Sequence, residues 1–233
     1  MIALPALLAA LAAAAQVPHP PQPPAAGAPK NRGKWPLCAN LDGLQSVQTR
    51  LRACTSIIDS GIENVHDLAR AYNNRGYANN DAGDPDRALA DLDEAIRLDP
   101  GYAKAYNNRG IAWGRRRDLS RALRDFESAI RLDPTLAMAY NNRGMVRARL
   151  GDLANASRDY AEAIRLDPQM AQAYYNRGRV QEAVKDRRRA LDDYREALRL
   201  MPGYDSARRR LCRLLPASGR KSAECAFPPE RGM

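Results

Sequence analysis

Residues 67–100 read DLARAYNNRGYANNDAGDPDRALADLDEAIRLDP, and close variants of this 34-residue unit follow it without a gap. The four copies are residues 67–100, 101–134, 135–168 and 169–202, and each of them ends in Pro. A fixed period of about this length is typical of a stacked helical solenoid. We therefore predict an all-α fold in which four helix–turn–helix units stack on one another.

Small and large apolar residues recur at helical spacing within each unit. In the first copy, Tyr72 and Gly76 mark the first helix, and Ala88, Leu92 and Ala95 mark the second. Gly and Ala allow two helices to approach closely, and the larger residue fills the space beside them. The pattern thus predicts two packed helices in each unit.

The turn residues agree with this prediction. In the first copy, Gly83-Asp84-Pro85 places a helix cap at Asp84 and a Pro at the first helical position. Pro100 ends the second helix, because Pro cannot continue the hydrogen-bond ladder.

The pattern resembles the tetratricopeptide repeat, whose motif runs aromatic, Gly, Ala, aromatic, Ala and Pro. The matching residues of the four copies are Tyr72, Gly76, Ala88, Leu92, Ala95 and Pro100; Tyr106, Gly110, Ala122, Phe126, Ala129 and Pro134; Tyr140, Gly144, Ala156, Tyr160, Ala163 and Pro168; and Tyr174, Gly178, Ala190, Tyr194, Ala197 and Pro202. Leu92 alone departs from this motif. The resemblance implies a right-handed superhelical solenoid that serves as an interaction module without catalytic activity.

A second departure is systematic, because Arg stands just before the Gly, where the family often has Leu. Asp follows each Arg after sixteen residues, which pairs Arg75 with Asp91, Arg109 with Asp125, Arg143 with Asp159 and Arg177 with Asp193. We hypothesise that these pairs form a ladder between packed helices, since a half-buried Arg needs such a partner. The alternative is that each Arg lies along its helix with its charged head in water.

The chain has 233 residues and carries 37 Lys and Arg against 27 Asp and Glu, a formal net charge of +10. The charge is uneven, because the first copy has eight acidic and four basic residues and the second copy has the reverse. Basic distal repeats favour anionic partners, such as acidic peptides, phospholipid headgroups or nucleic acid. The alternative is an ordinary solvated surface rich in Arg.

The N-terminus has features of an exported protein. Residues 1–15 are apolar, are fewer than the about 20 residues that span a bilayer, and end in small residues, so we predict a signal peptide. The positive charge that usually opens such a peptide is missing, since Lys30 is the first basic side chain. Residues 16–33 are rich in Pro and Ala and are predicted to form an extended linker. We expect a periplasmic or secreted protein rather than a cytoplasmic one, with no transmembrane segment in the mature chain.

All four cysteines flank the repeats. Cys38 and Cys54 precede them, and Cys212 and Cys225 follow them. Two local pairs in an exported chain predict the disulfides Cys38–Cys54 and Cys212–Cys225. A metal site or a redox-active thiol pair is not favoured, because the spacings lack Cys-x-x-Cys and the two histidines fit no ligand pattern.

The flanks are predicted to cap the stack, whose terminal repeats need a polar outer face or an extra helix. Residues 34–66 form an N-terminal capping segment with a degenerate half-repeat, which includes an amphipathic helix from Ser46 to Asp59. Residues 203–215 form a C-terminal capping helix, and residues 216–233 form an irregular tail.

In the family, the first helices line the concave face of the superhelix, so the resemblance implies which residues face a ligand. These groove residues are Arg70, Asn73, Tyr77, Lys104, Asn107, Ile111, Arg115, Asn141, Met145, Arg149, Tyr175 and Arg179. The Asn amides suit the backbone of an extended peptide, and Tyr77, Ile111 and Met145 suit an apolar side chain. The alternative for each Asn is a hydrogen bond to the neighbouring helix that only stacks the repeats.

We therefore expect a non-catalytic module that binds an extended peptide or a protein surface in the cell envelope. The sequence has no Gly-rich phosphate loop, no Gly-x-Ser-x-Gly and no His near a plausible nucleophile, so we expect no enzyme activity and no cofactor. Two alternatives stay open: a binder of polyanions, including acidic proteins, lipid headgroups or nucleic acid, and a structural adaptor in an envelope assembly. We expect a monomer, with an oligomer left open, and no sequence feature names the partner.

Overall fold

The computed structural model divides into two units, Met1–Arg32 and Gly33–Met233. It describes residues 31, 33–40, 43–61, 64–216 and 225. The predicted signal peptide, nearly all of the predicted linker and most of the predicted tail lie outside the described residues. All described helices belong to the second unit.

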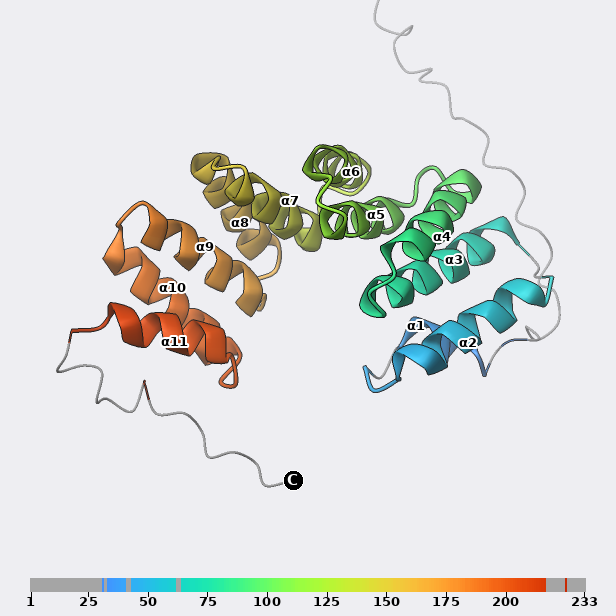
Figure 1. Cartoon of the computed structure of the whole chain (residues 1–233), viewed down its shortest axis with the longest axis horizontal. Helices are drawn as coiled ribbons and strands as arrows, with labels where there is room; N and C mark the ends of the chain where they lie inside the picture. The colour runs from blue at the N-terminus through green and yellow to red at the C-terminus, as the bar shows by residue number, and fades with distance from the viewer. Residues whose placement is uncertain (1–30, 32, 41–42, 62–63, 217–224, 226–233) are drawn as a thin grey trace, which may run out of the picture. The chain divides into compact units, whose positions relative to one another are not determined.

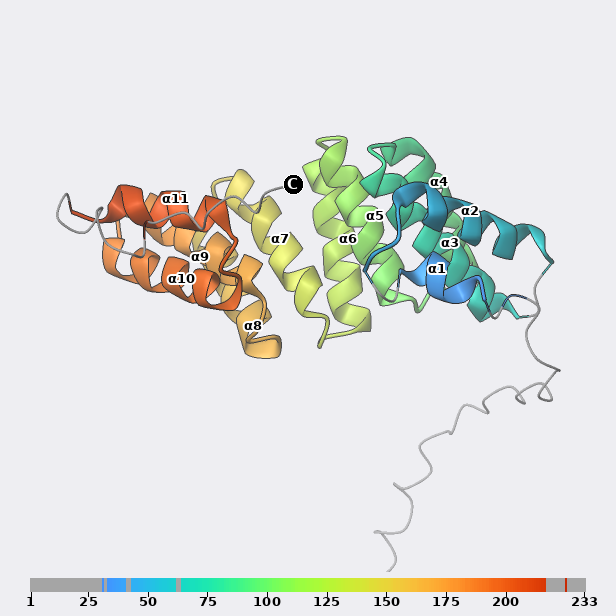
Figure 2. The same cartoon turned by 90° about the horizontal axis from the view of Figure 1, so that it is seen from below.

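The described residues form eleven α-helices and no strand, which confirms the predicted all-helical class. The helices are α1 (Trp35–Ala39), α2 (Val47–Asp59), α3 (Val65–Asp81), α4 (Pro85–Leu98), α5 (Ala103–Arg115), α6 (Leu119–Leu132), α7 (Ala137–Arg149), α8 (Leu153–Leu166), α9 (Ala171–Ala183), α10 (Arg187–Leu200) and α11 (Asp205–Leu214). The pairs α3/α4, α5/α6, α7/α8 and α9/α10 are the four repeats, and they follow one another along a curved stack (Figures 1 and 2).

Each second helix begins at an Asp side chain. Asp84, Asp118, Asp152 and Asp186 accept a hydrogen bond from the backbone N–H three residues later. Such a cap stabilises a helix by about 1 kcal/mol, because it satisfies a backbone N–H that has no partner within the helix. The Asp before Pro85 is thus the helix cap that the sequence predicted.

The residue before each of these caps has a left-handed backbone. Gly83 and Gly151 have φ values of 81° and 84°, which cost Gly little. Arg117 and Lys185 hold the same place in the second and fourth repeats, with φ values of 63° and 65°. The turn geometry therefore persists where the residue best suited to it is absent.

A close approach between the two helices of each repeat explains why Gly recurs at one position of the unit. A Cβ atom on Gly76, Gly110, Gly144 or Gly178 would lie 2.7–2.8 Å from a side-chain atom of Leu92, Phe126, Tyr160 or Tyr194, respectively. No real Cβ atom sits that close to a carbon atom without displacing it. The size alternation predicted from the sequence is therefore confirmed.

The hypothesis of an Arg–Asp ladder is also confirmed. Each Arg before the Gly donates hydrogen bonds from both Nε and Nη2 to the Asp sixteen residues later on the second helix. The shortest contact of each pair is 2.6–2.8 Å, and the Asp side chains are only 4–8 % exposed. Each guanidinium also lies 5.3–5.6 Å from the ring of the Tyr three residues earlier. The Arg heads are therefore bound between the helices.

The flanks carry helices and both disulfides. Ser46 caps α2, and the Cys38–Cys54 disulfide ties α2 to α1, a short helix that the sequence did not predict. The first repeat helix begins at Val65, slightly inside the segment predicted as the cap. At the other end, α11 packs on α10, and Cys212 on α11 is bonded to Cys225.

Candidate binding groove

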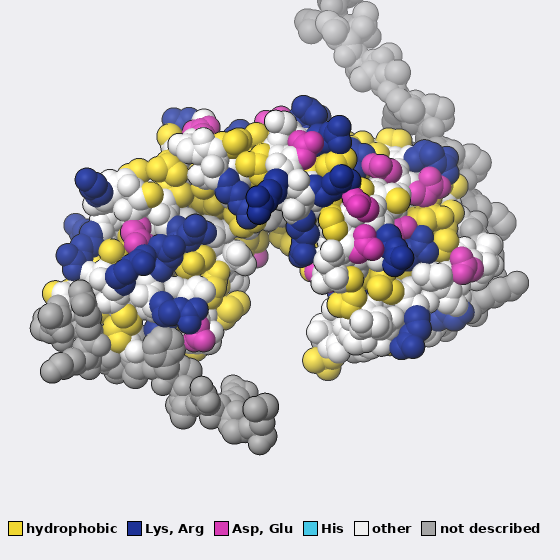
Figure 3. Space-filling view, viewed as in Figure 1, with side chains coloured by type: hydrophobic (Ala, Val, Ile, Leu, Met, Phe, Trp, Pro, Cys, Tyr) yellow, Lys and Arg dark blue, Asp and Glu magenta, His cyan; other side chains and the backbone are white. Residues whose placement is uncertain are grey.

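The first helices of the repeats line the inner side of the curve. Successive first helices contact one another, α3 with α5, α5 with α7 and α7 with α9, while the second helices pack chiefly against first helices. The stack therefore curves toward its first helices, as Figure 1 shows, and the hollow is visible in the space-filling view of Figure 3. The inner face formed by α3, α5, α7 and α9 is the candidate groove.

The predicted groove residues differ in their exposure. Six of them are exposed: Arg70, Tyr77, Lys104, Arg115, Arg149 and Arg179. Ile111, Met145 and Tyr175 are half-buried, and Asn73, Asn107 and Asn141 are only 3–6 % exposed. The basic residues and Tyr77 are thus exposed at the surface, the other apolar residues are partly accessible, and the three Asn side chains are buried.

The Asn side chains form a ladder of hydrogen bonds through the stack. Asn108, Asn142 and Asn176 donate from Nδ2 to Oδ1 of Asn73, Asn107 and Asn141 of the preceding repeat, at 2.9–3.0 Å. Asn73, Asn107 and Asn141 in turn donate to Oδ1 of the adjacent Asn74, Asn108 and Asn142, at 3.2–3.3 Å. Amides that are buried and hydrogen-bonded in this way hold adjacent repeats together. Asn73, Asn107 and Asn141 are therefore not part of the surface that a ligand could contact.

Two of the predicted groove residues contact the ends of the stack. The ring of Tyr77 lies 4.9 Å from the guanidinium of Arg50 on α2, and Arg50 also pairs with Asp81 at 2.7 Å. Tyr175 lies 4.8 Å from Tyr204, the residue that precedes α11. These side chains help to attach the flanking helices as well as lining the inner face.

An apolar pocket of about 270 Å³ opens between α5 and α7. It is lined by Gly110, Ile111, Gly114, Arg115, Phe126, Asn142, Met145, Val146 and Arg149. Phe126 is buried against Ala122 and Val146, so its ring is a fixed surface, and the two Arg side chains are exposed. The apolar pocket has the size of one aliphatic or aromatic side chain rather than that of a drug-sized ligand.

A second and larger pocket, which we name the arginine pocket, opens between α7 and α9. Its volume is about 560 Å³, and its lining is Met145, Ala148, Arg149, Leu153, Tyr160, Asn176, Arg179, Val180, Glu182, Ala183 and Arg210. Among the described residues, neither Arg149 nor Arg179 pairs with a carboxylate. Burial raises the pKa of the Tyr160 hydroxyl, which therefore stays protonated and can donate a hydrogen bond.

The one carboxylate of the arginine pocket already has partners. Glu182 accepts hydrogen bonds from the Tyr194 hydroxyl, Arg210 and Arg213 at 2.7–2.8 Å. Burial acts to raise the pKa of Glu182, but these three hydrogen bonds outweigh burial and lower that pKa overall. The free positive charge of the arginine pocket is therefore not cancelled by Glu182.

Sequence reasoning missed Tyr160 and Arg210 as members of a site. Tyr160 holds a packing position of the repeat motif, where its ring does lie, and Arg210 belongs to the capping helix, outside the predicted groove residues. The signal that could have found them is the change from Ala148 to Glu182 at the same position of consecutive repeats.

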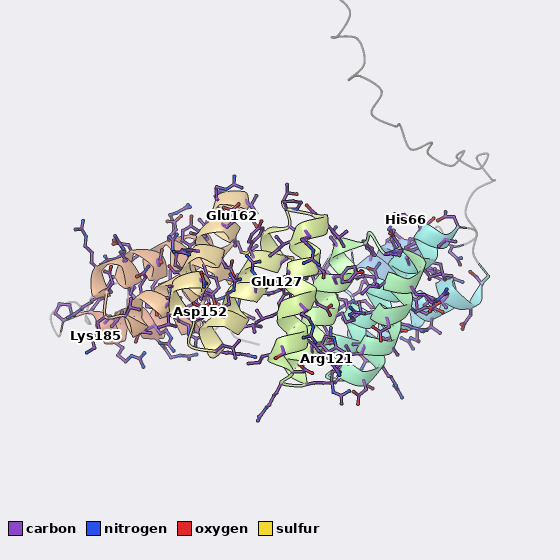
Figure 4. The ribbon with its side chains drawn as sticks, turned by 90° about the horizontal axis from the view of Figure 1, so that it is seen from above. His66, Arg121, Glu127, Asp152, Glu162 and Lys185 are labelled. Atoms are coloured by element: carbon purple, nitrogen blue, oxygen red, sulfur yellow. A yellow bond between two sulfur atoms is a disulfide. The ribbon has the colours of Figure 1, made fainter. Side chains whose placement is uncertain are left out.

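The outer face is formed by the second helices and differs from the groove. Arg121 and Glu127 of α6 and Glu162 of α8 lie on this side (Figure 4), and Glu162 pairs with Arg165 at 2.6 Å. Solvent screens exposed pairs of this kind, so they contribute little to stability. None of the helices in the described part of the chain combines the length and the apolar character that crossing a membrane requires. The described residues also hold no group of three His, Cys, Asp or Glu side chains suited to a metal ion.

Solved structures with the same fold include several bacterial proteins. TTC0263, a thermophilic tetratricopeptide repeat protein of Thermus thermophilus, is 18% identical with a TM-score of 0.68, over 79% of this chain and 98% of that chain. The pilF protein of Pseudomonas aeruginosa is 24% identical with a TM-score of 0.61, over 64% and 69%. MamA of Desulfovibrio magneticus RS-1, from residue 41 to its end, is 24% identical with a TM-score of 0.55, over 64% and 84%. Likeness at such identities shows the fold alone.

Family models match the repeats directly. The model described as tetratricopeptide repeat matches residues 69–102, a second model of that description matches residues 103–136 and 171–204, and a model described as TPR repeat matches residues 145–184. No curated protein is significantly similar to the chain in sequence. The matched residues span more than half of the chain, which therefore belongs to the tetratricopeptide repeat family and has the architecture of a protein–protein interaction scaffold.

Proposed function

We propose that the inner face of the repeats binds an extended segment of a protein partner, and that the protein is a non-catalytic scaffold of the cell envelope. The observation that carries the proposal is the pair of open pockets on the inner face, between α5 and α7 and between α7 and α9. The Asn ladder and the Arg–Asp ladder account for the polar residues that repeat in every unit. Other lining positions vary between units, as Ile111, Met145 and Arg179 do at one position, and a surface that selects a ligand requires such variation.

The length of the groove suits a short peptide. Neighbouring helix axes lie about 8–10 Å apart, so the four first helices span roughly 24–30 Å. An extended chain advances about 3.3 Å per residue, so about eight residues cover this distance. The exposed Arg115, Arg149 and Arg179 supply positive charge along this path.

The disulfides support a location in the envelope. Cys38 and Cys54 are bonded, and so are Cys212 and Cys225, and such bonds persist in oxidising compartments. The expected count of free thiols in protein taken from its native compartment is zero. Four free thiols in that material would contradict an exported location.

Two matched charge reversals in one repeat test the groove. Arg115 lies on the first helix and Arg124 on the second, both side chains are exposed, and neither forms an ion pair with another described residue. We expect Arg115→Glu to lose proteins that the wild type captures from an envelope extract, and Arg124→Glu to retain them. Equal capture by all three proteins would contradict binding at the inner face.

A polyanion is the second candidate ligand, because Asp and Glu side chains gather over α3 and α4, whereas Lys and Arg prevail among the charged side chains elsewhere on the visible face (Figure 3). Binding of this kind would appear as retention on heparin that falls steeply as salt rises, since released counterions drive it. Retention that does not depend on salt, or no retention, would remove this candidate.

A further inference from the structure

One position of the first helix differs in every repeat and decides whether the space beside it is open. It holds Asn80, Gly114, Ala148 and Glu182, at steps of one repeat. Asn80 is 1 % exposed and donates from Nδ2 to the backbone oxygen of Asn108 at 3.1 Å, so its side chain fills the space. Gly114 and Ala148 are too small to do so, and both of them line open pockets.

Glu182 shows how this chain binds a carboxylate at that position. Its Oε2 accepts hydrogen bonds from the Tyr194 hydroxyl and from Arg210, both at 2.8 Å. Its Oε1 accepts a hydrogen bond from Arg213 at 2.7 Å. One Tyr hydroxyl and two guanidinium groups therefore surround the carboxylate.

The arginine pocket presents equivalents of two of these three partners one repeat earlier, beside a position that has no carboxylate; the equivalent of Arg210 is Asn176. Tyr160 and Arg179 occupy the positions that correspond to Tyr194 and Arg213, and Ala148 stands where the next repeat has Glu. Tyr160 and Arg179 both line the arginine pocket. Among the described residues, the Tyr160 hydroxyl has no hydrogen-bond partner and Arg179 pairs with no carboxylate.

The charge around the arginine pocket favours an anion. Three Arg side chains and one Glu line it, and that Glu is already bound by Tyr194, Arg210 and Arg213. Hydrogen bonds to an ionised group are roughly twice as strong as neutral ones. A carboxylate that enters the arginine pocket would meet the Tyr160 hydroxyl and at least one guanidinium that has no other acidic partner.

We propose that the arginine pocket binds an acidic side chain of the peptide, and that its carboxylate accepts hydrogen bonds from Tyr160 and Arg179 as Glu182 does from Tyr194 and Arg213. The inference rests on the proposed function and names the chemistry of the peptide at that site.

The neighbouring apolar pocket takes an aliphatic or aromatic side chain. Equivalent points of adjacent repeats are about 8–10 Å apart, a distance that three residues of extended chain cover. The bound segment therefore carries an apolar and an acidic residue with two residues between them.

A first test needs no partner, because the chain itself can supply the carboxylate. Ala148→Glu places a carboxylate where the next repeat has Glu182, and Ala148→Gln is the matched neutral control. We expect a higher urea midpoint for Ala148→Glu than for Ala148→Gln, and we expect Arg179→Gln in both backgrounds to remove the difference. Equal midpoints for the two variants at position 148 would overturn the placement of the carboxylate.

A second test identifies the ligand with a phage library of random dodecapeptides, selected on the full oxidised protein. We expect the enriched peptides to have Asp or Glu three residues from an apolar residue. An enriched peptide made synthetically should bind about 10- to 100-fold more tightly than its copy with Gln or Asn at the acidic position, as measured by fluorescence anisotropy. Tyr160→Phe and Arg179→Gln should each reduce this ratio. Arg188→Gln, an exposed change on the second helix α10, should leave it unchanged.

The outcomes separate the two proposals. No enrichment on the wild type would overturn the groove and, with it, the acidic site. Enriched peptides without an acidic preference, or with one that survives Arg179→Gln, would overturn the arginine pocket alone. Tyr160→Phe is expected to fold, because Phe126 holds the same place in the preceding repeat.

Discussion

Replacing Gly110 by Ala should destabilise the stack, whereas Gly114→Ala in the same helix should stabilise it. A Cβ atom on Gly110 would lie 2.7 Å from Cε1 and 2.9 Å from Cδ1 of Phe126. Phe126 is 2 % exposed and packs against Ala122 and Val146, so its ring has little room to retreat. At Gly114, no heavy atom outside its own stretch of helix lies within 4 Å of the added atom.

The sizes of the two effects follow from these contacts. Overpacking of a core costs about 1–3 kcal/mol, and Gly→Ala within a helix contributes up to about 1 kcal/mol in the opposite direction. Gly110→Ala should therefore lower the free energy of unfolding by up to about 2 kcal/mol, and Gly114→Ala should raise it by about 0.5–1 kcal/mol. Because both variants share most of the helix term, their difference of about 1–3 kcal/mol approximates the steric cost.

The assay is urea unfolding of the oxidised protein, followed by far-ultraviolet circular dichroism. Neighbouring repeats unfold in a coupled way, so the two variants are compared with each other by their midpoints and slopes. A Gly110→Ala protein as stable as the Gly114→Ala protein would refute the argument that the helices approach too closely at Gly110 to admit a side chain.

The remaining predictions concern single side chains. Asp125→Asn should lower the free energy of unfolding in urea by about 1–3 kcal/mol, because it leaves the half-buried Arg109 with a weaker partner. Asp93→Asn removes the exposed partner of the same Arg and should lower it by less than about 1 kcal/mol. Equal losses for the two variants would argue against the ladder. The pKa of Glu182 is lowered from 4.5, so the stability that the ionised Glu182 contributes is present above pH 4.5 and is lost as the pH falls. The difference in unfolding free energy between the wild type and Glu182→Gln should therefore shrink on acidification. A difference that does not change with pH would contradict this. Arg117→Gly should raise the thermal midpoint by relieving the left-handed turn, and a lower midpoint would show that the Arg side chain contributes more than the backbone costs.

The helix pairs were predictable because their causes recur within each unit. Gly110 and Phe126 lie sixteen residues apart across one turn, and any helix pair of this period brings two such positions into contact. The same geometry joins Arg109 to Asp125, so the pairing could be proposed from spacing and burial alone. Contacts between two residues of the same repeat can therefore be predicted from the sequence.

Other features depend on distances between repeats, which the period does not supply. The Asn side chains fitted both a ligand and a neighbouring helix, and only the contact between Asn108 and Asn73 at 2.9 Å decides for stacking. The helix α1 lies outside the repeats and contains Pro36, so no periodic pattern predicted it. The arginine pocket joins Tyr160 and Arg179 from different repeats, and its trace in the sequence is a departure from the repeat rather than the repeat itself.

The most direct test of the inner face as the binding surface is site-specific photo-cross-linking to a selected peptide. Benzoylphenylalanine would replace Arg115 on the inner helix α5 in one protein and Arg124 on the outer helix α6 in another. We predict a cross-linked product from position 115 and none from position 124. A product from position 124 alone would place the partner on the second helices and contradict the groove.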